Sequence, residues 1–173
     1  VLNRTSGRTW QARGERTRDT DGLGKNTDFT FDANGNLTHR KNRRGKTFVT
    51  AFDDANRPVS TTTTGGKATS MTYFNNNQVK TVTEASGQKT TLAYNVRNLL
   101  ESKTDPMGTI SYAYDARGLL LTTTEGNAVI TRTYDARGRL ESYTRTVDGT
   151  VQYTLGYQWD ANGNLKRLTY PNG

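Results

Sequence analysis

Apolar and polar side chains alternate along short segments of the chain, with the period of two that is typical of β-strands. The alternation produces pairs such as Phe29/Phe31 and Tyr112/Tyr114. Threonine occupies many positions between these pairs, and because it is β-branched it fits a pleated sheet while facing water. The pattern predicts strands that share one half-apolar face and one polar face, with essentially no α-helix.

The alternation belongs to an internal repeat that is marked by an aromatic anchor, which we call position 0. Successive anchors are separated by 21, 21, 21, 21, 20, 20 and 25 residues, so residues 1–173 are predicted to form a single array of about eight repeats. The anchors are Trp10, Phe31, Phe52, Tyr73, Tyr94, Tyr114, Tyr134 and Trp159. Equal spacing predicts that they stand in a column on one face, each packed against the next.

The four residues after each anchor carry a turn signal. Asp or Asn at +1 favours a type I turn, and Gly or Asn at +4 favours the left-handed backbone of a three-residue hairpin loop with a bulge. Each repeat is therefore predicted to be a β-hairpin. The aspartates at +1 are Asp32, Asp53, Asp115, Asp135 and Asp160, and the residues at +4 are Gly14, Gly35, Asn56, Asn77, Asn98, Gly118, Gly138 and Gly163.

A second glycine signal predicts the turn that links one hairpin to the next. It stands fourteen residues after the anchor in five repeats and is slightly displaced in two others. The spacing of 25 residues between Tyr134 and Trp159 predicts a longer loop near 147–149 and a break in register. These glycines are Gly24, Gly45, Gly66, Gly87, Gly108, Gly126 and Gly149.

Composition excludes an ordinary closed core. Hydrophobic residues make up 31% of the chain, so each repeat must bury its aromatic stripe against its neighbours, as in other repeat proteins. The chain has no cysteine, which excludes disulfides and cysteine-based metal sites. The predicted fold class is all-β: tandem antiparallel hairpins that form a long curved or spiralling sheet.

The chain offers little that points to catalysis. His39 is the only histidine and lies on a predicted return strand, so an exposed strand position is the favoured interpretation over a catalytic one. The repeated Asp at +1 is better explained by turn capping than by paired-acid catalysis or Ca²⁺ binding, since +1 varies between repeats. The sequence therefore assigns no catalytic residue, no cofactor and no metal ligand.

Positive charge is concentrated in residues 1–46, which hold 11 Lys and Arg against five Asp and Glu. The segment 40–46 is a basic cluster that leads into a second turn. A contact with nucleic acid, anionic glycans or lipid headgroups is one interpretation. Protection of a sheet edge is the favoured one, because aromatic residues are not interleaved with the cations in the sequence.

The segments 31–37, 114–120 and 134–140 (FDANGNL, YDARGLL and YDARGRL) resemble the YD repeat of the RHS-repeat family, and the resemblance covers roughly residues 10–173. The family includes bacterial polymorphic toxins, toxin-complex shell subunits and teneurins. The resemblance implies a hollow shell of hairpins, which encloses a toxic C-terminal domain in bacterial members and serves cell adhesion in teneurins. No segment resembles the family's self-cleaving core, and the chain stops at Gly173, where a second turn is expected.

The predicted function is a non-enzymatic shell segment, part of a longer repeat region, that encloses or presents an effector domain lying outside residues 1–173. The expected partners are the rest of its own shell and the enclosed C-terminal domain, in a secreted or cell-surface bacterial protein. The alternative is a cell-surface adhesion or carbohydrate-binding module, in which exposed Tyr and Trp stack on sugars. Nucleic acid is not an expected partner.

Overall fold

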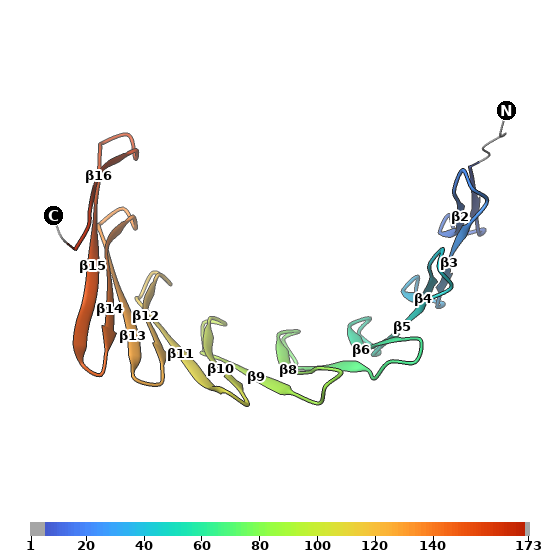
Figure 1. The fold of residues 1–173 in the computed structure, drawn as a ribbon, viewed down its shortest axis with the longest axis horizontal. Helices are drawn as coiled ribbons and strands as arrows, with labels where there is room; N and C mark the ends of the chain where they lie inside the picture. Colours follow the sequence, from blue (N-terminus) through green and yellow to red (C-terminus); the bar gives the residue numbers. More distant parts are fainter. Residues whose placement is uncertain (1–5, 172–173) are drawn as a thin grey trace. The chain divides into compact units, whose positions relative to one another are not determined.

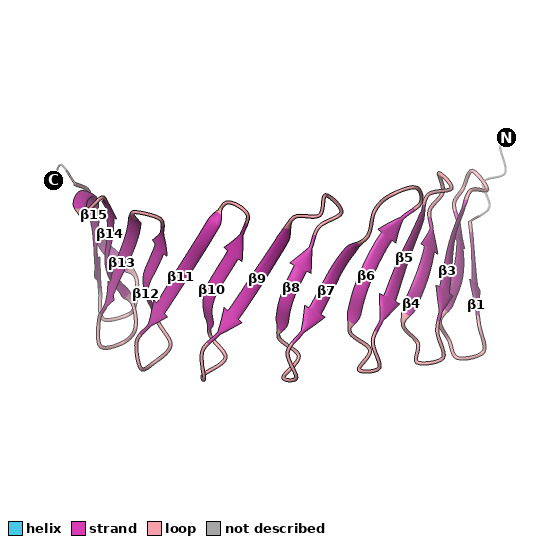
Figure 2. Ribbon diagram, turned by 90° about the horizontal axis from the view of Figure 1, so that it is seen from below, coloured by secondary structure: helices cyan, strands magenta, loops and turns pink. Residues whose placement is uncertain are grey.

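The computed structural model describes residues 6–171, which form one sheet of sixteen strands arranged in chain order. The chain divides into two compact units, Val1–Lys89 and Thr90–Gly173, in which every paired strand is antiparallel to its neighbour (Figure 1). The described residues contain no helix (Figure 2), and the predicted class of tandem antiparallel hairpins is confirmed. The expected turn at Gly173 lies outside the described residues.

The strands are short, and each hairpin joins an odd-numbered strand to the even-numbered strand that follows it. In the first unit they are β1 (Gly7–Trp10), β2 (Arg16–Thr20), β3 (Asn26–Phe31), β4 (Leu37–Lys41), β5 (Thr47–Phe52), β6 (Pro58–Thr63), β7 (Thr69–Tyr73) and β8 (Val79–Thr83). The others are β9 (Lys89–Tyr94), β10 (Leu100–Asp105), β11 (Gly108–Tyr114), β12 (Leu120–Glu125), β13 (Ala128–Tyr134), β14 (Leu140–Val147), β15 (Thr150–Trp159) and β16 (Leu165–Thr169).

The anchor turn has the same backbone geometry in all eight repeats. The amide of residue +1 donates to the carbonyl of +5, and the amide of +4 donates to the carbonyl of +1, both at 2.9 Å in the turn that begins at Asp135. Residue +4 has a positive φ in every copy, from 59° at Asn56 to 89° at Gly163. Because Asn tolerates this backbone better than most side chains, the three Asn copies keep the turn without a glycine.

A β-bulge follows each anchor turn and fixes which residues face each other. Tyr134 pairs with Leu140 at position +6, whereas Thr133 pairs with Ser142, so the returning strand carries one extra residue. The same shift occurs in all eight hairpins. The anchor and residue +6 are therefore direct cross-strand partners.

This pairing corrects the predicted column of anchors. Successive anchors lie on alternate strands, so the returning strand stands between them and separates their backbones by two strand spacings, about 10 Å. Centroids of packed aromatic rings are about 4.5–7 Å apart. The direct cross-strand partner of each anchor is thus the +6 residue of its own hairpin, and the row across the sheet alternates aromatic and mainly aliphatic residues.

The second turns are less uniform than the anchor turns. In the turn after β6 the left-handed residue is Gly65, with φ 73°, rather than the expected Gly66. The amide of Gly66 instead donates to the carbonyl of Thr63 at 2.8 Å, so Gly66 closes a four-residue turn in which Gly65 takes the third position. The prediction was one residue late here because two adjacent glycines satisfy the same sequence signal.

The repeat of 25 residues contains longer strands rather than the predicted longer loop. Strand β14 has 8 residues and β15 has 10, and they are joined by a tight turn at Asp148 and Gly149, whose φ values are 49° and 75°. Two successive left-handed residues define a type I′ hairpin turn, which matches the twist of the flanking strands. The break in register does occur, as a bulge between Arg145 and Thr146.

No hydrophobic side chain among the described residues is fully buried, and Thr81 is the one buried residue there, at 9% exposure. The low apolar content of the chain predicts that it has no closed core, and the described residues contain none. Stability has to come from the contacts between neighbouring strands and turns.

We expect substitutions of Gly138 to separate backbone strain from side-chain size. Gly138 has φ 81°, and a Cβ there would lie 3.4 Å from Leu119 Cδ1. Gly138→Ala is expected to lower the free energy of unfolding by about 1 kcal/mol or more. Gly138→Asn should lower it much less than Ala does, and Gly138→Val should lower it more than either. Denaturant unfolding measures this order. Equal stabilities for the three variants would contradict the left-handed assignment.

Candidate functional site: the interface between successive hairpins

The polar tip of an anchor joins its hairpin to the preceding one. Tyr114 and Tyr134 donate their hydroxyls to the carbonyls of Leu100 and Leu120, at 2.8 and 2.9 Å. Trp159 donates its indole Nε1–H to the Leu140 carbonyl at 2.7 Å in the same way. The acceptor is always residue +6 of the preceding repeat, and Tyr73 also follows this rule. Tyr and Trp thus combine an apolar ring that covers the sheet with a donor that satisfies the backbone.

The aspartate at +1 caps its own turn. In Asp135 one carboxylate oxygen accepts the amides of Arg137 and Arg139, both at 2.9 Å. The same pair of bonds, from residues +3 and +5, is made by Asp32, Asp53 and Asp115 and by the amide oxygen of Asn95. The sequence-based interpretation of +1 as a turn cap agrees with this geometry.

These hydrogen bonds also set the charge state of the caps. The pKa of the carboxyl group lies below its ordinary value in Asp32, Asp53 and Asp160, mainly because the side chain of residue +5 donates to it. In Asp135 the largest cause of the lowered pKa is the backbone N–H of Arg139. The caps therefore stay ionised well into mildly acidic solution.

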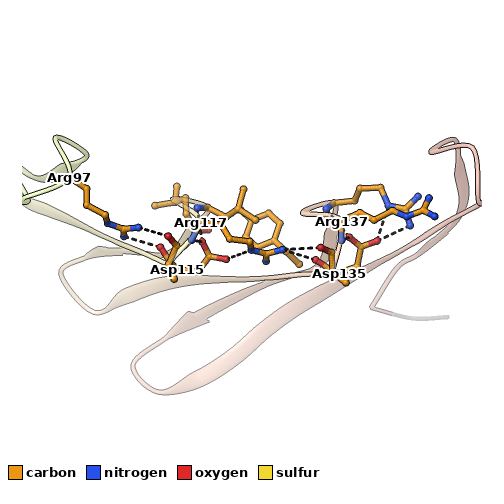
Figure 3. Close-up of polar contacts among 11 residues, drawn as sticks. Arg97, Asp115, Arg117, Asp135 and Arg137 are labelled. Atoms are coloured by element: carbon orange, nitrogen blue, oxygen red, sulfur yellow. Dashed lines mark hydrogen bonds and ion pairs between the residues drawn. The ribbon is translucent and has the colours of Figure 1, made fainter.

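Arginine side chains hydrogen-bond each anchor turn to the anchor turn of the following repeat, a contact that we call the clasp. Arg97 donates from its two Nη atoms to the carbonyls of Asp115 and Ala116, both at 2.8 Å (Figure 3). Arg117 reaches the carbonyls of Asp135 and Ala136, at 3.1 and 3.3 Å. Arg137 continues the row by donating to the carbonyl of Ala161 at 2.8 Å. A row of charged donors thus satisfies the turn carbonyls of the following repeat.

Arginine at +5 performs the clasp together with two further contacts. Arg57 donates to Asp53 of its own turn at 2.8 Å and to the Phe74 carbonyl of the next turn at 3.1 Å. Its guanidinium also lies 4.6 Å from the ring centroid of Tyr73. Arg139 makes the equivalent contacts with Asp135, Asp160 and Trp159. One side chain therefore holds its own cap, the next turn and the next anchor.

Asparagine at +4 has a second role in the first unit. The Asn36 amide donates to Asn56 Oδ1 at 2.7 Å, and Arg57 donates to Asn77 Oδ1 at 2.9 Å. Asn at this position both adopts the left-handed backbone and offers an acceptor to the preceding turn. The turn pattern in the sequence indicates only the first of these roles.

The residues at +3 and +5 were missed as a group from the sequence, although their signal was present. An arginine at +3 recurs in Arg97, Arg117 and Arg137, and a side chain with N–H donors stands at +5 in Asn36, Arg57 and others. The recurrence is less regular than that of the anchors and of the Asp–Gly turn, because +3 and +5 also hold other residue types. A long donor repeated at one turn position is the pattern that predicts a clasp between repeats.

The predicted repeat positions lie where these contacts are made. The anchors end the odd-numbered strands and are half-buried, apart from Trp10 at 59% exposure on the outermost described strand, β1. The +1 and +4 residues flank each turn loop. The structure brings Tyr73, Tyr114, Tyr134 and Trp159 into contact with the preceding repeat, but it does not gather the repeat positions into one pocket.

The same geometry offers no assembled reactive centre among residues 6–171. His39 is exposed on β4, and its Nδ1 contacts the hydroxyl of Thr38 at 3.1 Å. Within that range no three His, Cys, Asp or Glu side chains are placed to share a metal ion. The described residues also include no helix with the length and apolar character needed to cross a membrane.

The fold and its interlocked turns define a tandem β-hairpin repeat protein. The family model of the Teneurin YD-shell matches residues 64–173, and the chain belongs to this family. It is thus a YD-repeat structural shell segment. No curated protein matches the chain in sequence.

Solved toxin-complex structures share the fold at low sequence identity. The structure of the Photorhabdus luminescens Tc holotoxin pore, with the mutation TccC3-D651A, is 21% identical, with a TM-score of 0.73 over 84% of this chain. The crystal structure of TcdB2-TccC3 without its hypervariable C-terminal region is 20% identical, with a TM-score of 0.71 over 85% of this chain. This chain spans only 9% of the length of either match.

The anchor tips supply a direct test of the interface. Tyr134→Phe removes one hydroxyl and leaves the ring, so we expect the free energy of unfolding to fall by about 0.5–1.5 kcal/mol. Tyr112→Phe is the matched control, because the Tyr112 hydroxyl makes no hydrogen bond with any described residue. Chemical denaturation compares the two. Equal effects would show that the bond to the Leu120 carbonyl contributes nothing.

Proposed function

We propose that this chain is one continuous array of eight YD repeats that serves as a non-enzymatic wall around another polypeptide. The observation that carries the proposal is the clasp between successive turns. Arg97, Arg117 and Arg137 all donate to backbone carbonyls, so the contact depends on the repeat geometry rather than on the identity of the next side chain. An interface of this kind extends a sheet one hairpin at a time, which is what a wall requires.

Family membership and the toxin-complex fold support the same role. We infer that the polypeptide enclosed or presented by the wall lies outside residues 1–173 and that the whole protein acts as a secreted or cell-surface bacterial protein. One of the similar structures is that of TcdB2-TccC3 without its hypervariable C-terminal region. A wall can enclose a variable domain of this kind, because the contacts that hold the wall together are made with backbone groups of its own repeats.

The anchor environment favours the wall over the carbohydrate-binding alternative. Stacking on a sugar needs an exposed ring face, whereas the rings of Tyr114, Tyr134 and Trp159 are half-buried and their donors are already bonded to the backbone. Tyr73 and Trp159 also have a guanidinium over the ring. These four anchors are therefore engaged within the sheet.

Cryo-electron microscopy of the natural gene product that contains residues 1–173 tests the proposal. We expect the eight hairpins to appear as part of a closed wall with polypeptide density inside it. Limited proteolysis gives a matched readout: the enclosed domain should resist cleavage in the wild type and become sensitive in the Gly138→Val variant. Hairpins with solvent on both faces, or a neighbouring domain cleaved equally in both proteins, would overturn the proposal.

A further inference from the structure

The two rows of turns in the first unit differ in charge. The anchor turns and the second turns lie at opposite ends of the strands (Figure 2). The anchor turns of this unit carry four acidic residues and two basic ones between +1 and +5. They are Arg13, Glu15, Asp32, Asp53, Asp54 and Arg57.

The second turns from β2 to β7 are strongly basic instead. We call the cations of these turns and of the adjoining end of β4 the basic edge: Lys25, Arg40, Lys41, Arg43, Arg44, Lys46 and Lys67. All seven are exposed. The single acidic residue in these turns is Asp21, which pairs with Arg43 at 3.4 Å.

Most of this charge is left without an acidic partner. Among residues 6–171 the other six cations of the basic edge form no ion pair. The nearest carboxylates on β2 and β3 are already engaged, since Asp19 contacts Arg8 and Arg16, and Asp28 contacts Arg18. A row of like charges in this state attracts a polyanion.

The cations also recur at a regular interval. Lys25, Lys46 and Lys67 are 21 residues apart and each stands fifteen residues after its anchor. Because adjacent second turns are two strand spacings apart, about 10 Å, the lysines form a line across the strand ends. The acidic groups on successive units of a linear polymer can therefore contact the lysines of successive second turns in order.

The aromatic ring at this edge corrects an expectation from the sequence. Basic and aromatic residues are not interleaved along the chain, but strand pairing brings them together: Arg40 lies 4.5 Å and Lys46 lies 5.6 Å from the ring centroid of Phe48. The ring supports the two cations, so it is not a free platform for a nucleobase. The second turns themselves, at 21–25, 42–46 and 64–68, contain no aromatic residue.

We propose that the basic edge binds an acidic polysaccharide, a linear glycan with sulfate or carboxylate groups. Exposed and regularly spaced cations, six of the seven outside any ion pair with a described residue, provide the charge complementarity, and the described residues of this edge offer no free aromatic ring for a nucleobase to stack on. This surface is separate from the anchor faces, which are occupied within the sheet. It gives a shell segment a contact with an extracellular matrix or capsule that the wall function does not require.

A fluorescent heparin octasaccharide tests the proposal by anisotropy at about 150 mM NaCl. The edge variant replaces Lys25, Arg44, Lys46 and Lys67 with Gln and is expected to bind at least about tenfold more weakly. Its log–log salt slope should be shallower by about three to four, one for each lost ionic contact. The matched control removes the same charge from exposed cations elsewhere: Lys89→Gln, Arg145→Gln, Lys166→Gln and Arg167→Gln.

The control variant should keep wild-type affinity within about twofold, and circular dichroism should show that both variants are folded. Equal losses in the two variants would mean that only net charge matters, which overturns the site. No binding by the wild type would overturn it as well. Tighter binding of a single-stranded DNA of equal charge would assign the edge to nucleic acid and contradict the polysaccharide.

Discussion

The structure depends on one constraint: each hairpin must be stabilised by hydrogen bonds and packing with the adjacent hairpin, because no described hydrophobic side chain is fully buried. A closed core would stabilise many strands at once, whereas here Tyr73, Tyr114, Tyr134 and Trp159 each donate to one carbonyl of the preceding hairpin. The Tyr134 hydroxyl and the Arg117 guanidinium act on adjacent repeats in opposite directions along the chain. The contact between repeats is therefore reciprocal, and the array is stabilised link by link.

This constraint explains why the repeat keeps backbone geometry more strictly than side-chain identity. Most acceptors in the interface are carbonyls, which every residue has, so Ala116, Asp135 and Ala161 serve equally well. What must persist is the position of the turn, which the cap at +1 and the left-handed residue at +4 hold. Phe31 and Phe52 show that even the anchor's donor is dispensable when neighbouring contacts remain.

Much of the fold could be predicted from the sequence because local turn chemistry repeats with the chain. The anchor turns were placed to the residue, since Asp and Gly at a fixed spacing have one compatible backbone. The recurrence of a donor at +5 indicates a contact between repeats, but the particular partners of Arg57 depend on which strands lie between two anchors, so the structure was needed to identify them. Phe48 shows the same limit, since Arg40 reaches its ring only through strand pairing. The two glycines at Gly65 and Gly66 left the turn ambiguous by one residue.

Removing one complete repeat tests the central claim most directly. Deletion of residues 114–133 joins Ala113 to Tyr134, which places Arg97 opposite the turn of Asp135 and the Tyr134 hydroxyl opposite Leu100. Denaturant unfolding of this variant should still be cooperative, and its free energy of unfolding should fall only by the contribution of one repeat. A deletion of residues 124–133, half a repeat, should abolish that cooperativity. If both deletions destabilised the chain equally, stability would not come from nearest-neighbour contacts and the account would be wrong.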